Sequence, residues 1–282
     1  MSKRVSNRVA AIQMVSGHDI EANLAEAQKL LKEAAAEGAS VAVLPENFAV
    51  LATSQMIDCG RQEAGPEPVI RAFLAEQARK LGIWIVGGSM PVAKRPDGSE
   101  IEDRVRATCL VFDDQGREVA RYDKIHLFDV GVPDSAEAYR ESATFVAGPP
   151  TPHVVDTPIG RLGLSVCYDL RFPELYRAMA AEGAEIVVAP SAFTHTTGSA
   201  HWHVLTRARA IENLVTMIAP NQAGHHANGR RTYGHSLIID PWGQIKAEAQ
   251  SEANEVIVAP IDRARIASLR EGFPCLSHRR LF

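Results

Sequence analysis

The sequence has few cysteines, and they are widely spaced. Its 282 residues include four, and no two of them form a CxxC pair: Cys59, Cys109, Cys167 and Cys275. Neither a disulfide framework nor a structural zinc site built from thiolate pairs is therefore expected. A free cysteine is most often a small buried apolar residue. We interpret Cys59, Cys109 and Cys275 in this way, because no motif surrounds them.

Long apolar runs and excess positive charge are also missing. No run of about 18 apolar residues occurs, so no segment is predicted to span a membrane. Basic residues at the N-terminus precede no apolar stretch of signal-peptide length, and a cytoplasmic location is the default expectation. The net charge of −4 and the pI near 6.2 argue against a surface that binds polyanions. Neither nucleic acid nor a membrane is therefore an expected partner.

Apolar runs alternate with helical patterns along the whole chain, which is typical of sheets covered by helices. The predicted strands are 9–14, 41–44, 83–87, 105–112, 119–122, 161–166, 186–189, 215–219, 236–239 and 256–260. The predicted helices are 20–37, 66–81, 173–182 and 262–270. One more helix is indicated by a single face that carries Trp202, Leu205, Ala208 and Ile211.

The order of these elements favours a layered α/β fold. Hairpins at about 105–122 and 236–258 argue against a purely parallel sheet, so a mixed-sheet α/β sandwich fits better than a barrel. Neither a linker nor a repeat interrupts the chain, and one domain over residues 1–282 is the simplest interpretation. The stretch 128–152 shows little periodicity, and loops of this length are often functional.

Cys167 differs from the other cysteines in its position. It follows the predicted strand RLGLSV and precedes YDLRFPEL, which enters a helix at Pro173. A sharp strand-to-helix turn lifts a nucleophilic side chain above the edge of a sheet. The N–H groups and positive dipole end of a nearby helix N-terminus lower a thiol pKa and hold an oxyanion. Cys167 is therefore the candidate nucleophile.

Two charged residues also follow predicted strands: Glu46 in VLPENF and Lys124 in YDKIHLFD. Taken singly, the ordinary interpretations are a capping acid and a solvated lysine. If the strands share a direction, both side chains converge with Cys167 at one sheet edge. A carboxylate there takes the thiol proton and later helps to protonate the departing nitrogen, while the lysine stabilises an oxyanion.

The segments LPENF, YDKIHLFD and CYDLRFPE resemble the three motifs of the nitrilase superfamily of carbon–nitrogen hydrolases. Further stretches resemble its Nit branch, which contains deaminated-glutathione amidases and ω-amidases: FDV near Phe128, PSAFTHTTGSAHW, RARAIEN and YGHSLIIDPWG. The resemblance extends from about residue 7 to residue 281. It implies a four-layer αββα sandwich, with two mixed β-sheets covered by helices.

The resemblance also implies a catalytic set of Glu46, Lys124 and Cys167. Glu141 matches a second glutamate of the family, which we expect to orient the lysine or the substrate. Family members dimerise through an α-layer, so a homodimer or higher homo-oligomer is expected. The C-terminal segment, about 271–282, is expected at a subunit interface.

The implied reaction is amide hydrolysis through a cysteine thioester, with release of ammonia. Lys124 and the Tyr168 backbone N–H are expected to hold the oxyanion, and Glu46 to activate water. Neither a cofactor nor a metal is expected. The expected substrate is a small carboxylated ω-amide: deaminated glutathione first, α-ketoglutaramate second, and N-carbamoyl compounds or nitriles after these.

Several alternatives stay open. Arg171 is predicted either to clamp a substrate carboxylate or to pair with a structural acid such as Glu174. Thr197, with Thr194 and Thr196, either lines the pocket or hydrogen-bonds its own loop. The two rings of the HxH pair His201 and His203 point about 200° apart on a helix, so a metal shared between them is not expected.

Two other functions compete with hydrolysis. A catalytically silent binding or scaffold protein would be expected to have lost at least one reactive group, and all are present. A redox-active thiol protein would need a resolving cysteine, and none lies near Cys167 in the sequence.

Overall fold

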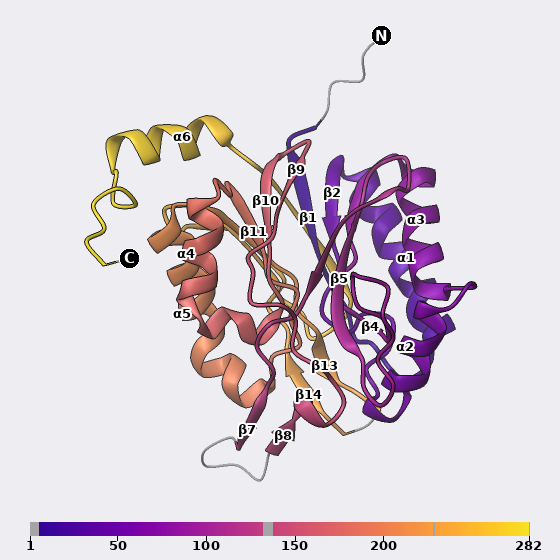
Figure 1. Ribbon diagram of the computed structural model, residues 1–282. Coiled ribbons are helices and arrows are strands. Elements are labelled where there is room, and N and C mark those ends of the chain that lie inside the picture. The colour runs from indigo at the N-terminus through magenta and orange to yellow at the C-terminus, as the bar shows by residue number, and fades with distance from the viewer. Residues whose placement is uncertain (1–5, 132–137, 228, 282) are drawn as a thin grey trace.

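Two mixed β-sheets face each other between outer layers of helices (Figure 1). The computed structural model describes residues 6–131, 138–227 and 229–281. In those three ranges, no helix combines the length and the apolar character that crossing a bilayer requires. The predicted four-layer sandwich of mixed sheets is confirmed.

The first sheet has seven strands and is covered by the N-terminal helices. Its order is β17 (Glu255–Pro260), β1 (Arg8–Gln13), β2 (Ala39–Val43), β3 (Trp84–Val86), β5 (Arg106–Phe112) and β4 (Met90–Val92), with β6 (Glu118–Asp123) also paired to β5. The covering helices are α1 (Ile20–Ala36), α2 (Met56–Ala64) and α3 (Val69–Leu81).

The second sheet has six strands and carries the other helical layer. Its order is β16 (Ile245–Glu248), β15 (Leu237–Ile239), β12 (Thr216–Ala219), β11 (Ile186–Val188), β10 (Gly160–Leu164) and β9 (Val154–Thr157). The helices on its outer side are α4 (Pro173–Ala181) and α5 (His195–Asn213), and α6 (Arg263–Gly272) leads away toward the C-terminus.

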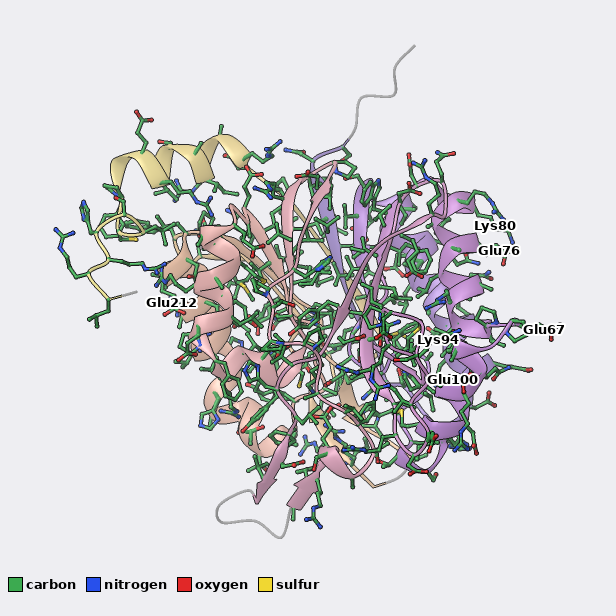
Figure 2. The ribbon with its side chains drawn as sticks, in the orientation of Figure 1. Glu67, Glu76, Lys80, Lys94, Glu100 and Glu212 are labelled. Atoms are coloured by element: carbon green, nitrogen blue, oxygen red, sulfur yellow. The ribbon has the colours of Figure 1, made fainter. Side chains whose placement is uncertain are left out.

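The sandwich buries both faces of its central strands. In β1, Val9 and Ala11 belong to the core shared with the second sheet, while Ala10 and Ile12 belong to the core shared with the helices. This arrangement explains why β1 is a continuous apolar run rather than an alternating one. Figure 2 shows side chains filling the space between the layers, with charged pairs such as Glu76 and Lys80 (2.7 Å) on the outer side of α3.

The structure corrects several predicted elements. Helix α2 was not predicted, and its Glu63 carboxylate accepts hydrogen bonds from the first three N–H groups of α3. The β5–β6 hairpin is confirmed, but β15 pairs with β16, while β17 crosses to the first sheet and pairs with β1. On α5, Trp202 is buried as expected, whereas Ile211 is 44% exposed, because Thr206, Arg209 and Ala210 turn inward instead.

Two short hairpins lie in segments that were interpreted as loops or turns. One pairs β7 (Asp129–Gly131) with β8 (Ala138–Arg140) inside the stretch 128–152, and the other pairs β13 (Ala223–His225) with β14 (Arg231–Tyr233). Their strands of three residues are too short for sequence periodicity to reveal. Both hairpins contribute residues to the cavity described below.

Candidate active site

The predicted residues Glu46, Lys124 and Cys167 all follow strands, but the strands belong to two sheets. Glu46 follows β2 and Lys124 follows β6, and the pairing through β3 and β5 makes these two strands parallel. Cys167 follows β10 in the second sheet. The site is therefore assembled between the two sheets, and the expectation that all three residues share one sheet edge is corrected.

Cys167 occupies a strained backbone conformation. Its φ angle is +47°, in the left-handed region that non-glycine residues seldom adopt, and its N–H donates to the carbonyl of Pro190 at 2.9 Å. The residue begins a short 3₁₀ turn, Cys167–Arg171, and α4 follows at Pro173. This is the sharp strand-to-helix turn that the sequence predicted.

The turn that carries Cys167 is fixed by a buried carboxylate. Asp169 accepts hydrogen bonds from the Tyr122 hydroxyl (2.6 Å), the Val166 N–H (2.8 Å) and the His126 Nδ1 (2.7 Å). Tyr122 and His126 flank Lys124 in the chain. Asp169 therefore ties the segment that carries Lys124 to the turn that carries Cys167.

Lys124 lies between two carboxylates. Its Nζ lies 2.8 Å from Glu46 Oε1, and 2.8 and 3.0 Å from the two oxygens of Glu141. Glu141 is itself oriented by the Phe128 N–H, which donates to its Oε2 at 2.6 Å. The Lys124 side chain is only 2% exposed, so both ion pairs lie in a medium of low dielectric, where they are strong.

These contacts set the protonation states of the site. Burial opposes the charge of Lys124, but the charges of Glu141 and Glu46 outweigh it and hold the pKa of the lysine well above its usual value. Burial also raises the pKa of the Cys167 thiol, and the charge of Glu46 raises it further, against the lowering effects of Lys124 and the Ala192 N–H. In the resting site Lys124 is therefore an ammonium group and Cys167 a neutral thiol.

All the predicted site residues line one cavity of about 710 Å³: Glu46, Lys124, Glu141, Cys167, Tyr168, Arg171 and Thr197. This volume lies within the range of small-molecule sites, roughly 300–1,000 Å³. Aromatic rings form part of the wall, with Phe128 and Tyr168 in edge-to-face contact at 5.0 Å. The cavity can therefore hold a substrate larger than a simple amide.

The structure shows which groups Arg171 and the threonines contact. Within the described residues, the Arg171 guanidinium contacts His201 Nδ1 at 3.3 Å and the rings of Tyr168 and Phe193, and it does not pair with Glu174. Thr194 caps α5 by accepting from the Thr197 N–H at 3.2 Å. The threonines thus begin a helix rather than a loop, and Thr194 and Thr197 also face the cavity.

The remaining cysteines lie outside the cavity lining. Cys59 and Cys109 are buried, and burial raises the pKa of each thiol to about 12, with the charge of Glu63 adding to the effect at Cys59. All four cysteines are free. Protonated, buried thiols are poor nucleophiles, which agrees with the structural interpretation of Cys59 and Cys109.

The family model for carbon-nitrogen hydrolases matches residues 8–271, which is nearly the whole chain. The chain belongs to the carbon–nitrogen hydrolase family. It is therefore an enzyme that hydrolyses carbon–nitrogen bonds, and the predicted membership of the nitrilase superfamily is confirmed.

Individual relatives of this carbon–nitrogen hydrolase agree with the Nit branch. The deaminated glutathione amidase of Yersinia enterocolitica is 40% identical over 96% of the chain and 92% of its own length. The chloroplastic omega-amidase of Arabidopsis thaliana is 36% identical, over 96% of the chain and 72% of its own length. The crystal structure of Saccharomyces cerevisiae Nit3, of branch 10 of the nitrilase superfamily, matches with a TM-score of 0.84 and 33% identity over all of both chains.

The sequence did not predict every residue of the candidate site. Asp169 lies within the CYDLRFPE motif but was not singled out, although an acid two residues after a candidate nucleophile was a usable signal. Arg140 and Arg230 also line the cavity, and they come from the two unpredicted hairpins. No local pattern marked either arginine.

Proposed function

We propose that this carbon–nitrogen hydrolase is an amidase in which Cys167 is the nucleophile, Glu46 the general base and Lys124 the oxyanion partner. The observation that carries the proposal is the buried Lys124 ammonium group, which contacts Glu46 and Glu141 beside the neutral Cys167 thiol. The thiol is not activated in the resting site. It needs a base at the moment of attack, and Glu46 lies beside it.

The reaction follows in two halves. As the Cys167 sulfur bonds to the amide carbon, Glu46 takes the thiol proton and the carbonyl oxygen becomes an oxyanion. The negative charge thus moves from Glu46 to the substrate oxygen, and the net charge of the site is unchanged. Lys124 and the Tyr168 N–H hold the oxyanion, Glu46 passes its proton to the nitrogen, and the C–N bond breaks.

The second half releases the acid. Water attacks the thioester carbon while Glu46 takes one of its protons. The C–S bond then breaks, and Glu46 returns that proton to the sulfur, which regenerates the thiol and the Glu46 carboxylate. Glu141 keeps Lys124 charged and in place throughout, because it contacts the ammonium group with both oxygens. The chain residues supply every proton transfer in this scheme.

The cavity favours a substrate with more than one carboxylate. Arg140, Arg171 and Arg230 all line it, and guanidinium groups bind carboxylates by paired hydrogen bonds. Deaminated glutathione carries carboxylates at both ends, whereas α-ketoglutaramate carries one. We therefore place deaminated glutathione first. The departing nitrogen of deaminated glutathione belongs to a dipeptide, so its hydrolysis releases that dipeptide. Ammonia is released only from a primary amide such as α-ketoglutaramate.

A substrate panel tests this assignment. We expect kcat/KM for deaminated glutathione to exceed that for α-ketoglutaramate, measured through the keto acid that both release. Arg171→Leu should lower kcat/KM by about 10- to 200-fold for the preferred substrate, because a charged hydrogen bond of roughly 1.5–3 kcal/mol is lost. Arg171→Lys keeps the positive charge but cannot form the paired hydrogen bonds of a guanidinium group. Its kcat/KM should therefore lie between that of wild type and that of Arg171→Leu.

A higher kcat/KM for a neutral amide that has no carboxylate would contradict the proposed substrate class. It would not contradict the proposed thioester mechanism. A catalytically silent protein would turn over nothing on the panel. A redox-active thiol is disfavoured by the raised pKa of Cys167, because oxidation begins from the thiolate.

We also propose that the chain acts as a homodimer in the cytoplasm. The four cysteines are free, which suits a reducing compartment. Large apolar side chains lie exposed on the side of α5 and the C-terminal segment: Val204 (68%), Ile211 (44%), Trp242 (53%) and Phe273 (52%). Trp242 and Phe273 touch edge to face, which joins the C-terminal segment to this surface. The predicted α-layer dimer with the segment 271–282 at its interface would cover these residues.

Val204→Glu should shift the protein from dimer to monomer, because it places a charge among the exposed apolar side chains of the proposed interface. Sedimentation equilibrium measures the change. Val119→Glu is the matched control, since Val119 is 39% exposed on β6 and lies outside this surface. An unchanged mass for Val204→Glu would contradict the assignment of the interface.

A further inference from the structure

Away from the lining of the catalytic cavity, three side chains bring metal-ligand atoms together. His203 comes from α5, His235 from the connection between β14 and β15, and Glu248 from the end of β16. His203 Nε2 and His235 Nδ1 each lie 2.9 Å from the same oxygen, Glu248 Oε1. The potential ligand atoms of the three residues all lie within 4.8 Å of one another.

The scaffold holds these side chains in place. His235 has a φ angle of +53°, a left-handed backbone conformation that persists only where the surrounding structure holds it. Its carbonyl accepts a hydrogen bond from the fully buried Trp202 indole at 2.7 Å, and the Tyr233 ring lies 4.6 Å from its own. The three ligand side chains are 32%, 34% and 22% exposed, so an ion can reach them from solvent.

We propose that His203, His235 and Glu248 form a binding site for one divalent transition-metal ion of the Zn²⁺ class. Two imidazole nitrogens and one carboxylate oxygen are a preferred ligand set for such ions, with water in the fourth position. Calcium and magnesium prefer sites made wholly of oxygen. Without the ion, both rings donate to Glu248. With it, each neutral ring carries its proton on the other nitrogen and offers the freed lone pair to the metal.

This site differs from the HxH pair, His201 and His203, for which the sequence predicts no shared metal. The HxH pair does not converge, because His201 Nδ1 faces the Arg171 guanidinium while His203 faces Glu248. The partner of His203 is instead His235, which lies 32 positions further along the chain. An ion here would join α5 to the edge of the second sheet. Trp202 connects this place to the cavity wall through its contact with Phe193 at 4.9 Å.

Titration of chelator-treated, full-length protein with Zn²⁺ by calorimetry tests the site. We expect one ion per chain and a higher unfolding temperature with zinc. His203→Gln and Glu248→Gln should each weaken zinc binding by at least about tenfold, since losing a ligand costs no less than losing a hydrogen-bond partner of a ligand. His201→Gln is the matched control for the binding measurement and should leave the affinity unchanged.

Co²⁺ provides a second probe, because thiolate ligands give a charge-transfer band that nitrogen and oxygen ligands do not. We expect Co²⁺ to bind without that band, and equally in the Cys167→Ala variant. A thiolate band, or zinc affinity that survives in both ligand variants or falls equally in His201→Gln, would overturn the proposal. Unfolding temperatures without metal show whether each variant is folded; if His203→Gln is not, Glu248→Gln decides the question.

Discussion

Cys167→Ala should lower amide hydrolysis by about 10⁶-fold, the scale on which removal of a nucleophile from a coupled catalytic set acts. Without the sulfur no thioester forms, and Glu46 has no proton to take. The backbone strain at residue 167 is already present with cysteine, so alanine adds none. Release of the keto acid in single-turnover and steady-state assays measures the loss, and mass spectrometry of the intact wild-type protein detects the thioester.

Cys167→Ser is the matched variant, because it keeps a nucleophilic atom at the same place. It should also be far slower than wild type, since a hydroxyl is a weaker nucleophile than a thiol beside the same base. Hydrolysis that persists in Cys167→Ala would exclude the thioester route. A stability loss large enough to unfold the alanine variant would be visible as a lower unfolding temperature.

Glu46→Gln should reduce amide turnover by about 10²–10⁴-fold, the usual contribution of a general base. The same substitution should lower the pKa of Cys167. Burial still raises that pKa, but the charge and hydrogen bond of Glu46, which raise it further, are gone, while Lys124 continues to lower it. A lower pKa means more thiolate at a given pH. The midpoint of the pH profile for iodoacetamide labelling of Cys167 should therefore shift to lower pH.

Amide turnover reports the role of Glu46 as a base, and the midpoint of the labelling profile reports its effect on the pKa of Cys167. Glu141→Gln is the comparison, because it removes the other carboxylate of Lys124 and leaves the base in place. It should lower turnover with a smaller effect on the thiol. Near wild-type turnover in Glu46→Gln would rule out its role as base, and a labelling midpoint moved to higher pH would contradict the account of the Cys167 pKa.

The layered fold and the positions of the candidate reactive residues after strands were predictable because their signals are local. The long apolar runs of β1 and β5 identify strands buried on both faces, and the strand-to-helix turn at Cys167 is visible in the sequence. Resemblance to a family then supplied the expected roles of Glu46 and Lys124, which stay predictions. The periodicity of the sequence was sufficient to predict the bounds of α1, which differ from the predicted bounds by a single residue.

Features that depend on distant contacts were not predictable. The position of Asp169 two residues after Cys167 could have marked it, but the sequence does not show that it joins two segments through Tyr122 and His126. The three-residue strands β13 and β14 form because they pair with each other, not because of their own periodicity. Glu248 forms hydrogen bonds with both His203 and His235 only because the fold brings α5 and the segment before β15 next to β16. Each case requires knowledge of which elements become neighbours.

The origin of the reactive groups in two sheets has a consequence for the growing chain during translation. Glu46 and Lys124 are synthesised first, and Cys167 follows more than forty positions after the lysine. The first sheet still lacks β17, its edge strand, until residues Glu255–Pro260 have been added. All three candidate reactive residues are therefore present in a growing chain that still lacks β17, and the sandwich that brings them together is complete only after this edge strand has been added.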